Sequence, residues 1–135
     1  MRTLLSLSAL LLSILFVQIS AGVLRPFDSI SGQILGFSSV EIGLVASGHF
    51  LGFLIGCTVS PKLITRSGHT TAFAALVGLA TIAIIAHPLV TDPIFWTVIR
   101  AVAGFALAGC YTVAESWLQA KSSNTNRARV FSVYR

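Results

Sequence analysis

Charge is scarce in this sequence of 135 residues, because only 10% of them are Asp, Glu, Lys or Arg, against about 25% in an ordinary soluble domain. Apolar residues make up 55%, and the mean hydropathy is +0.88. A soluble fold of this composition would leave large apolar patches facing water. Intrinsic disorder is excluded, because disordered chains have few apolar residues and many charges. Two cysteines are too few for a disulfide scaffold. These absences leave an integral membrane protein as the class.

The few charges are unbalanced, with nine Lys or Arg residues against four Asp or Glu. The basic residues stand singly or in pairs and form no basic run and no nucleic-acid-binding motif. We therefore expect no nucleic-acid partner. In a membrane protein such an excess sets the orientation, because loops rich in Lys and Arg stay on the cytoplasmic side.

Four stretches are apolar and long enough to span a bilayer, which takes roughly 20 residues. They are residues 4–24, 40–64, 71–89 and 94–118, and an incomplete fifth segment follows at 130–135. No alternating strand pattern is sustained, which disfavours a β-barrel. The sequence predicts an all-α polytopic transmembrane helix bundle with four complete spans and the start of a fifth.

Helix signals stand at the boundaries of these spans. Ser38 and Glu41 form the S-x-x-E pattern of a capping box before the second span. Asp92 and Pro93 are residue types preferred at the N-cap and first position of the fourth. Gly68 is typical of the residue that follows a helix end.

The distribution of basic residues among the loops predicts the orientation. Six lie on the side of the N-terminus: Arg2, Lys62, Arg66, Lys121, Arg127 and Arg129. Arg25 alone is expected in the opposite loops, together with the acidic Asp28. This bias predicts a cytoplasmic N-terminus for a multi-pass protein, which we expect in the inner (plasma) membrane. Residues 1–22 also resemble a signal peptide, which leaves cleavage near Ala21 open.

Polar side chains within the spans are the candidate cavity residues, because lipid tolerates them only if they reach water, a partner or a ligand. Arg100 is the first candidate, about one turn inside the fourth span. His49 in the second span and Gln18 in the first follow. Arg25 is the last, and we favour a local ion pair with Asp28, three residues away, over contact with a ligand.

Small residues mark the helix faces that we expect to pack closely. Gly48, Gly52 and Gly56 repeat at a spacing of four, and Gly104 follows Arg100 by four residues. Such stripes let two helix backbones approach. We expect the glycine stripe of the second span to find no partner within this chain.

The sequence contains no catalytic set, no Gly-rich phosphate loop and no cluster of metal ligands. Cys57 and Cys110 lack the spacing of metal ligands, and we interpret both as small packing residues. We therefore predict that the protein is not an enzyme and has neither a cofactor nor a metal site.

Three motifs resemble the major facilitator superfamily of transporters. The segment from Pro61 to His69 is similar to the loop motif G-x-x-x-D-R-x-G-R between helices two and three. Arg66 and Gly68 match this motif, whereas Pro61 replaces its first Gly and Thr65 its Asp. Arg100-x-x-x-Gly104 resembles the motif of helix four. The segments A-E-S-W-L at 114–118 and N-R-A-R at 126–129 look like the YcaD-like branch.

The resemblance implies a partial N-terminal six-helix half of a twelve-helix secondary transporter, here residues 1–135. A small solute would bind between the halves near the midplane, and rocking would alternate access. The implied partners are the lipid bilayer, the solute, the remaining helices of the full-length chain and protons as candidate coupling ions. A cytoplasmic gate network would consist of Arg66, Gly68, Glu115, Arg127 and Arg129.

Two other interpretations remain open. One is a complete four-helix membrane protein, such as a small multidrug exporter that works as a dimer. Such an exporter needs a membrane-buried acid in its first helix, and the span at 4–24 contains none. The other is a membrane scaffold that transports nothing.

Overall fold

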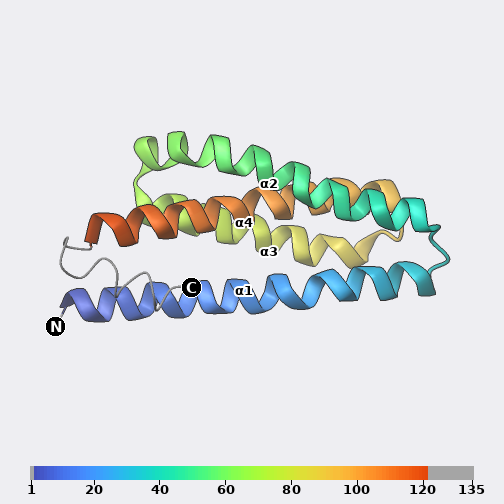
Figure 1. Cartoon of the computed structure of the whole chain (residues 1–135), viewed down its shortest axis with the longest axis horizontal. Helices are drawn as coiled ribbons and strands as arrows, with labels where there is room; N and C mark the ends of the chain where they lie inside the picture. Colours follow the sequence, from blue (N-terminus) through green and yellow to red (C-terminus); the bar gives the residue numbers. More distant parts are fainter. Residues whose placement is uncertain (1, 122–135) are drawn as a thin grey trace.

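The computed structural model describes residues 2–121, which form four long helices and one short one (Figure 1). They are α1 (Arg2–Ile34), α2 (Ser39–Ser67), α3 (His69–Ala86), the short 3₁₀ helix η1 (His87–Leu89) and α4 (Pro93–Lys121). Each long helix contains a segment long and apolar enough to cross a membrane. Residues 2–121 contain no strand. The predicted all-α polytopic bundle is confirmed, and the segment at 130–135 lies outside the described residues.

The first span is longer than expected. Helix α1 continues ten residues past Leu24 and passes Pro26 before it ends at Ile34. The boundary near residue 24 was wrong, because it treated Arg25 and Asp28 as loop residues. Both lie inside a membrane-length helical segment, Ser8–Ile34. Asp28 lies beside His87 of η1 and Arg100 of α4, and such partners reduce the cost of a charge inside a span.

Local signals explain where the other helices begin and end. The Ser38 backbone N–H donates to the Glu41 carboxylate at 2.7 Å, and the Glu41 N–H donates back to the Ser38 hydroxyl at 3.3 Å. The predicted capping box is therefore present. At α4, the Phe95 N–H donates to Asp92 Oδ1 at 2.8 Å, which caps the helix as expected.

A single residue, Gly68, connects α2 to α3. Its φ of 79° lies in the left-handed region, where a side chain would be strained. Its N–H donates to the Ile64 carbonyl at 2.9 Å and satisfies one of the last acceptors of α2. Glycine at this position therefore allows two long helices to reverse direction without a loop.

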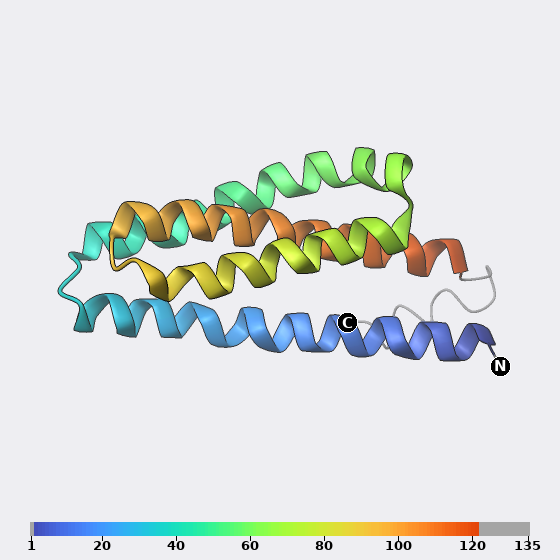
Figure 2. The same ribbon diagram turned by 180° about the vertical axis from the view of Figure 1, so that it is seen from behind.

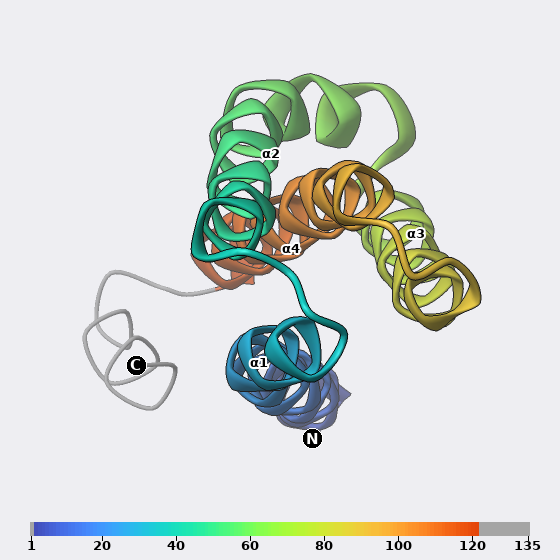
Figure 3. The ribbon, with the colours of Figure 1, turned by 90° about the vertical axis from the view of Figure 1, so that its right-hand side faces the viewer.

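Helix α4 is the centre of the bundle and packs against the three other long helices (Figure 3). Leu10 and Ile14 of α1 meet Ala114 and Leu118 of α4 in one buried cluster. A second cluster joins Ala72 and Leu76 of α3 to Cys110 and Val113 of α4. Most large apolar side chains on the outer faces are exposed, as expected for a surface that faces lipid.

The glycine stripe of α2 packs directly on the backbone of α4. A Cβ at Gly48 would lie 2.6 Å from the Thr97 carbonyl oxygen, and one at Gly56 would lie 2.5 Å from that of Phe105. Gly52 stands against the Ala101 carbonyl in the same way, and Gly104 against that of His49. The expectation that the stripe has no partner within the chain was wrong, because α4 is that partner.

The two cysteines differ in their surroundings. Cys110 is buried between α3 and α4, as a packing residue should be. Cys57 is exposed on α2, so its interpretation as a packing residue was wrong for the helices described here.

Candidate functional site

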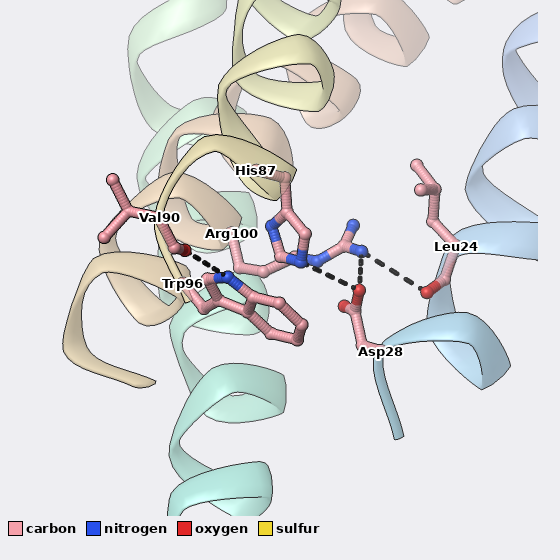
Figure 4. Close-up of polar contacts among 6 residues, drawn as sticks. All are labelled: Leu24, Asp28, His87, Val90, Trp96 and Arg100. Atoms are coloured by element: carbon pink, nitrogen blue, oxygen red, sulfur yellow. Dashed lines mark hydrogen bonds and ion pairs between the residues drawn. The ribbon is translucent and has the colours of Figure 1, made fainter. Parts of the chain in front are cut away.

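Arg100 is buried where α4 faces α1, with only 6% of its surface exposed. Its Nη2 donates to the carboxylate of Asp28 and, at 3.3 Å, to the carbonyl oxygen of Leu24 (Figure 4). Leu24 and Asp28 are four residues apart and therefore share one face of α1. The buried guanidinium thus joins α1 to α4 by an ion pair.

His87 adds a third titratable group to this pair. Its Nε2 lies 3.2 Å from Asp28 Oδ1, close enough for an ion pair when the imidazole is protonated. The ring packs on Trp96 in a tilted arrangement at a centroid distance of 4.2 Å, and Trp96 Nε1 donates to the Val90 carbonyl at 2.8 Å (Figure 4). Three elements, α1, η1 and α4, therefore converge on one carboxylate.

The expected pairing within α1 was wrong. Asp28 is paired with Arg100 and lies beside His87, both on other elements, and it forms no ion pair with the nearby Arg25. Sequence reasoning missed His87, which precedes Pro88 near the end of the predicted third span. Its signal was available, because His87 is a titratable residue at the edge of an apolar segment.

A cavity of about 540 Å³ lies next to this cluster. Residues of all four long helices line it, and most of its surface is apolar. Its volume is within the range of roughly 300–1,000 Å³ typical of sites for small molecules. Arg25, Asp28, His49 and Arg100 contribute its titratable groups apart from one cysteine.

Three of the four cavity candidates therefore line one space. Arg25 is exposed on α1, and it has no hydrogen bond or ion pair among residues 2–121. His49 is half-buried, and both of its ring nitrogens are covered by neighbouring atoms without a hydrogen-bond partner. The structure does not bring Gln18 to the lining of this cavity. Its Oε1 instead accepts a hydrogen bond of 2.6 Å from the Tyr111 hydroxyl.

Three of the candidate gate residues, Arg66, Gly68 and Glu115, lie at the opposite end of the bundle (Figure 1). The beginning of α1, the turn between α2 and α3 and the end of α4 share this end (Figures 1 and 2). Arg66 is exposed in the last turn of α2, and Glu115 is exposed on α4. A hydrogen bond of 3.0 Å between His69 Nε2 and the Ser116 hydroxyl ties the start of α3 to this part of α4. Arg127 and Arg129 lie outside the described residues.

Membrane-length helices around a cavity with buried charges define a polytopic membrane protein with an intramembrane polar site. Comparison with known families assigns it further. The chain belongs to the family described as "Uncharacterised MFS-type transporter YbfB", whose model matches residues 33–134. The resemblance to the major facilitator superfamily is thereby confirmed, whereas the narrower YcaD-like assignment is not supported by this match.

Curated relatives carry the same description. The chain is 28% identical over 94 residues to an uncharacterized MFS-type transporter of Enterobacter sp. (strain 638). It has the same identity to counterparts in Yersinia pestis (strain Pestoides F) and Yersinia pseudotuberculosis (serotype O:1b). Each alignment covers 70% of this chain and 25% of the relative, so the matched region spans a quarter of those proteins. No solved structure matches the chain.

Proposed function

We propose that the full-length protein is a secondary active transporter that moves a small solute by alternating access. The observation that carries this proposal is the cavity between the helices, with its buried charged cluster, in a chain of an MFS-type transporter family. Residues 1–135 would form part of the N-terminal six-helix half. The solute would bind between this half and the remaining helices of the chain.

The location that we propose is the inner membrane, with a cytoplasmic N-terminus. Support comes from the basic residues, because Lys62 and Arg66 lie toward the end of α2 on the side of the N-terminus. Arg25 no longer counts against this bias, since it lies inside α1 and not in a loop. The positive-inside rule therefore favours this orientation more strongly than the sequence alone suggested.

The ion pair of Asp28 and Arg100 is the candidate coupling device. Asp28 is the carboxylate on which α1, η1 and α4 converge. Protonation of this carboxylate would replace the ion pair by a weaker hydrogen bond from Arg100 to a neutral carboxyl group. Because the pair joins α1 to α4, binding and release of a proton would favour different arrangements of these two helices.

The cytoplasmic gate remains a proposal built on Arg66, Gly68, Glu115, Arg127 and Arg129. An ion pair at a wet interface contributes only about 0–1 kcal/mol, so such a network would bias the gate and not hold the fold. We expect Glu115→Gln in the full-length protein to change the rate of solute uptake more than the amount of protein in the membrane. Unchanged uptake would make the network merely structural.

The small multidrug exporter is the second candidate, and one argument against it has changed. Its required acid was missing from residues 4–24, but α1 extends to Ile34 and includes Asp28. What disfavours the exporter is the family match over residues 33–134. No observation favours a membrane scaffold.

Labelling of single cysteines from the two faces of the membrane tests the proposal. Ser20 lines the cavity, whereas Val23 is 62% exposed and lies outside the lining. In full-length protein without other cysteines, Ser20→Cys should react with a membrane-impermeant maleimide in both right-side-out and inside-out vesicles. Val23→Cys is the matched control and should stay unlabelled, because it faces lipid. Labelling of Ser20→Cys from one face only would contradict alternating access.

A further inference from the structure

The charges of the cavity do not balance. Arg25, Asp28 and Arg100 all line it, and the Asp28 carboxylate is already paired with Arg100. Arg25 has no hydrogen bond or ion pair among residues 2–121. The described part of the cavity therefore presents one unmatched positive charge, and that charge is not the one on Arg100.

The position of Arg25 makes this charge hard to satisfy with solvent at the membrane surface. It lies nine residues before the end of α1 at Ile34, which is about 14 Å along the axis at 1.5 Å per residue. It is also seventeen residues after Ser8, inside the membrane-length segment Ser8–Ile34 of α1. A guanidinium at such a depth is retained where it meets water, a partner or a ligand.

The rest of the cavity is suited to an apolar body. Phe16 of α1, Phe50 of α2 and Phe73 of α3 contribute aromatic rings from three sides. Most of the lining surface is apolar, and the polar residues besides the charged ones are His49 and four that carry hydroxyl groups, Ser13, Ser20, Ser29 and Thr81. A cation in an apolar, aromatic-walled space is complementary to a molecule that carries one negative group on an apolar body.

We propose that the solute is a small hydrophobic monoanion, an aryl- or alkyl-carboxylate, whose carboxylate binds to Arg25. This inference rests on the proposed transport function and assigns the substrate class to it. Arg100, which the sequence placed first among the cavity candidates, is a positioning residue here, because its charge is matched by Asp28. Its role is to hold α1 against α4, so that Arg25 is presented to the cavity.

Three probes with the same apolar body separate charge from shape. They are 4-phenylbutyrate, 4-phenylbutanol and 4-phenylbutylamine, and calorimetric titration measures their binding to the full-length protein at pH 7.5. Nanodiscs of zwitterionic lipid exclude anionic headgroups as the occupant. We expect the carboxylate to bind at least about tenfold more tightly than the alcohol, as a charge-assisted hydrogen bond implies, and the amine most weakly.

Variants assign the preference to one residue. Arg25→Gln should reduce the carboxylate preference to less than about threefold, whereas Arg25→Lys, which keeps the charge, should retain most of it. Lys62→Gln is the matched control, because Lys62 is an exposed cation on α2 outside the cavity lining and should leave all three affinities unchanged. Misfolding is checked by size-exclusion chromatography of each variant.

The outcomes are decisive in both directions. Equal binding of carboxylate and alcohol, tightest binding of the amine, or no binding of any probe would overturn the inference. An unchanged preference for the carboxylate in Arg25→Gln would also overturn it. Loss of phenylbutyrate binding when phosphatidylglycerol is added would do the same, because it would assign Arg25 to a lipid headgroup. If Ser20→Cys is labelled from both faces but the protein does not prefer the carboxylate probe, the substrate inference fails and the transport proposal stands. If the preference is present but labelling is one-sided, the transport proposal fails and the binding site stands.

Discussion

Asp28→Asn in the full-length protein leaves the Arg100 guanidinium buried without a carboxylate. The side chains of Asp28 and Arg100 expose only 12% and 7% of their surface, respectively, so little solvent reaches the guanidinium that remains. Removal of one partner from a buried ion pair costs about 3–5 kcal/mol. Because the Asn amide oxygen still accepts a hydrogen bond, we expect a loss of about 3 kcal/mol in unfolding free energy, at the lower end of that range.

The double variant Asp28→Asn/Arg100→Met separates pairing from burial. Met replaces the buried charge by an apolar side chain of similar length, and such replacements are often neutral. The double variant should therefore regain much of the lost stability. The cycle should give a coupling energy of about 2–4 kcal/mol between the two positions.

Unfolding of the purified protein in mixed micelles, followed by circular dichroism as the share of denaturing detergent rises, measures these free energies. Asp92→Asn is the matched control. It also removes an acidic charge, but Asp92 is an exposed N-cap and Asn caps a helix equally well. Its effect should stay within about 0.5 kcal/mol. A coupling energy below about 0.5 kcal/mol would refute the assignment of Asp28 and Arg100 as a buried pair.

Three further outcomes are expected of the full-length protein. Arg100→Lys should abolish most solute uptake into proteoliposomes while the protein still inserts, because an ammonium group on a flexible stem would not hold both Asp28 and the Leu24 carbonyl in the geometry of the guanidinium; near-normal uptake would show that the position of α1 against α4 requires only the charge. Gly52→Ala should destabilise the protein by about 1–3 kcal/mol in the same micelle assay, because its Cβ meets the α4 backbone, whereas Gly78→Ala, with open space around the Cβ, should cost nothing. Gln33→Cys, at the far end of α1, should react with impermeant maleimide only from outside the cell, and Ser67→Cys only from inside; the reverse pattern would invert the orientation.

Features encoded by neighbouring residues could be predicted from the sequence. The four helices follow from apolar length, and the caps at Ser38 and Asp92 follow from side chains that reach backbone groups three residues away. The end of α1 could not be predicted in this way. Hydropathy counts Asp28 as unfavourable in a span, but the carboxylate is paired with groups that come later in the chain.

The candidate site also combines features that the sequence predicts with features that depend on distant parts of the chain. The sequence identified Arg100 and Arg25 as costly charges within or beside apolar segments, but it could not decide which of them has a partner. That partner lies 72 residues from Arg100, and a single sequence carries no information on which helices are neighbours. His87 could be recognised in the sequence as a titratable residue at the edge of an apolar segment, but its proximity to Asp28 depends on how the helices pack.

The central position of α4 has a consequence for synthesis of the protein at the ribosome. Helices α1, α2 and α3 make few contacts with one another, and most of the packing waits for α4. At the usual pace of translation, the 72 residues between Asp28 and Arg100 correspond to a delay of roughly 4–14 s. During that interval the carboxylate of α1 is without its cation and the glycine stripe of α2 is without its packing surface. Arrival of α4 in the bilayer then supplies both the cation for Asp28 and the packing surface for α2, so most of the packing among these four helices forms late.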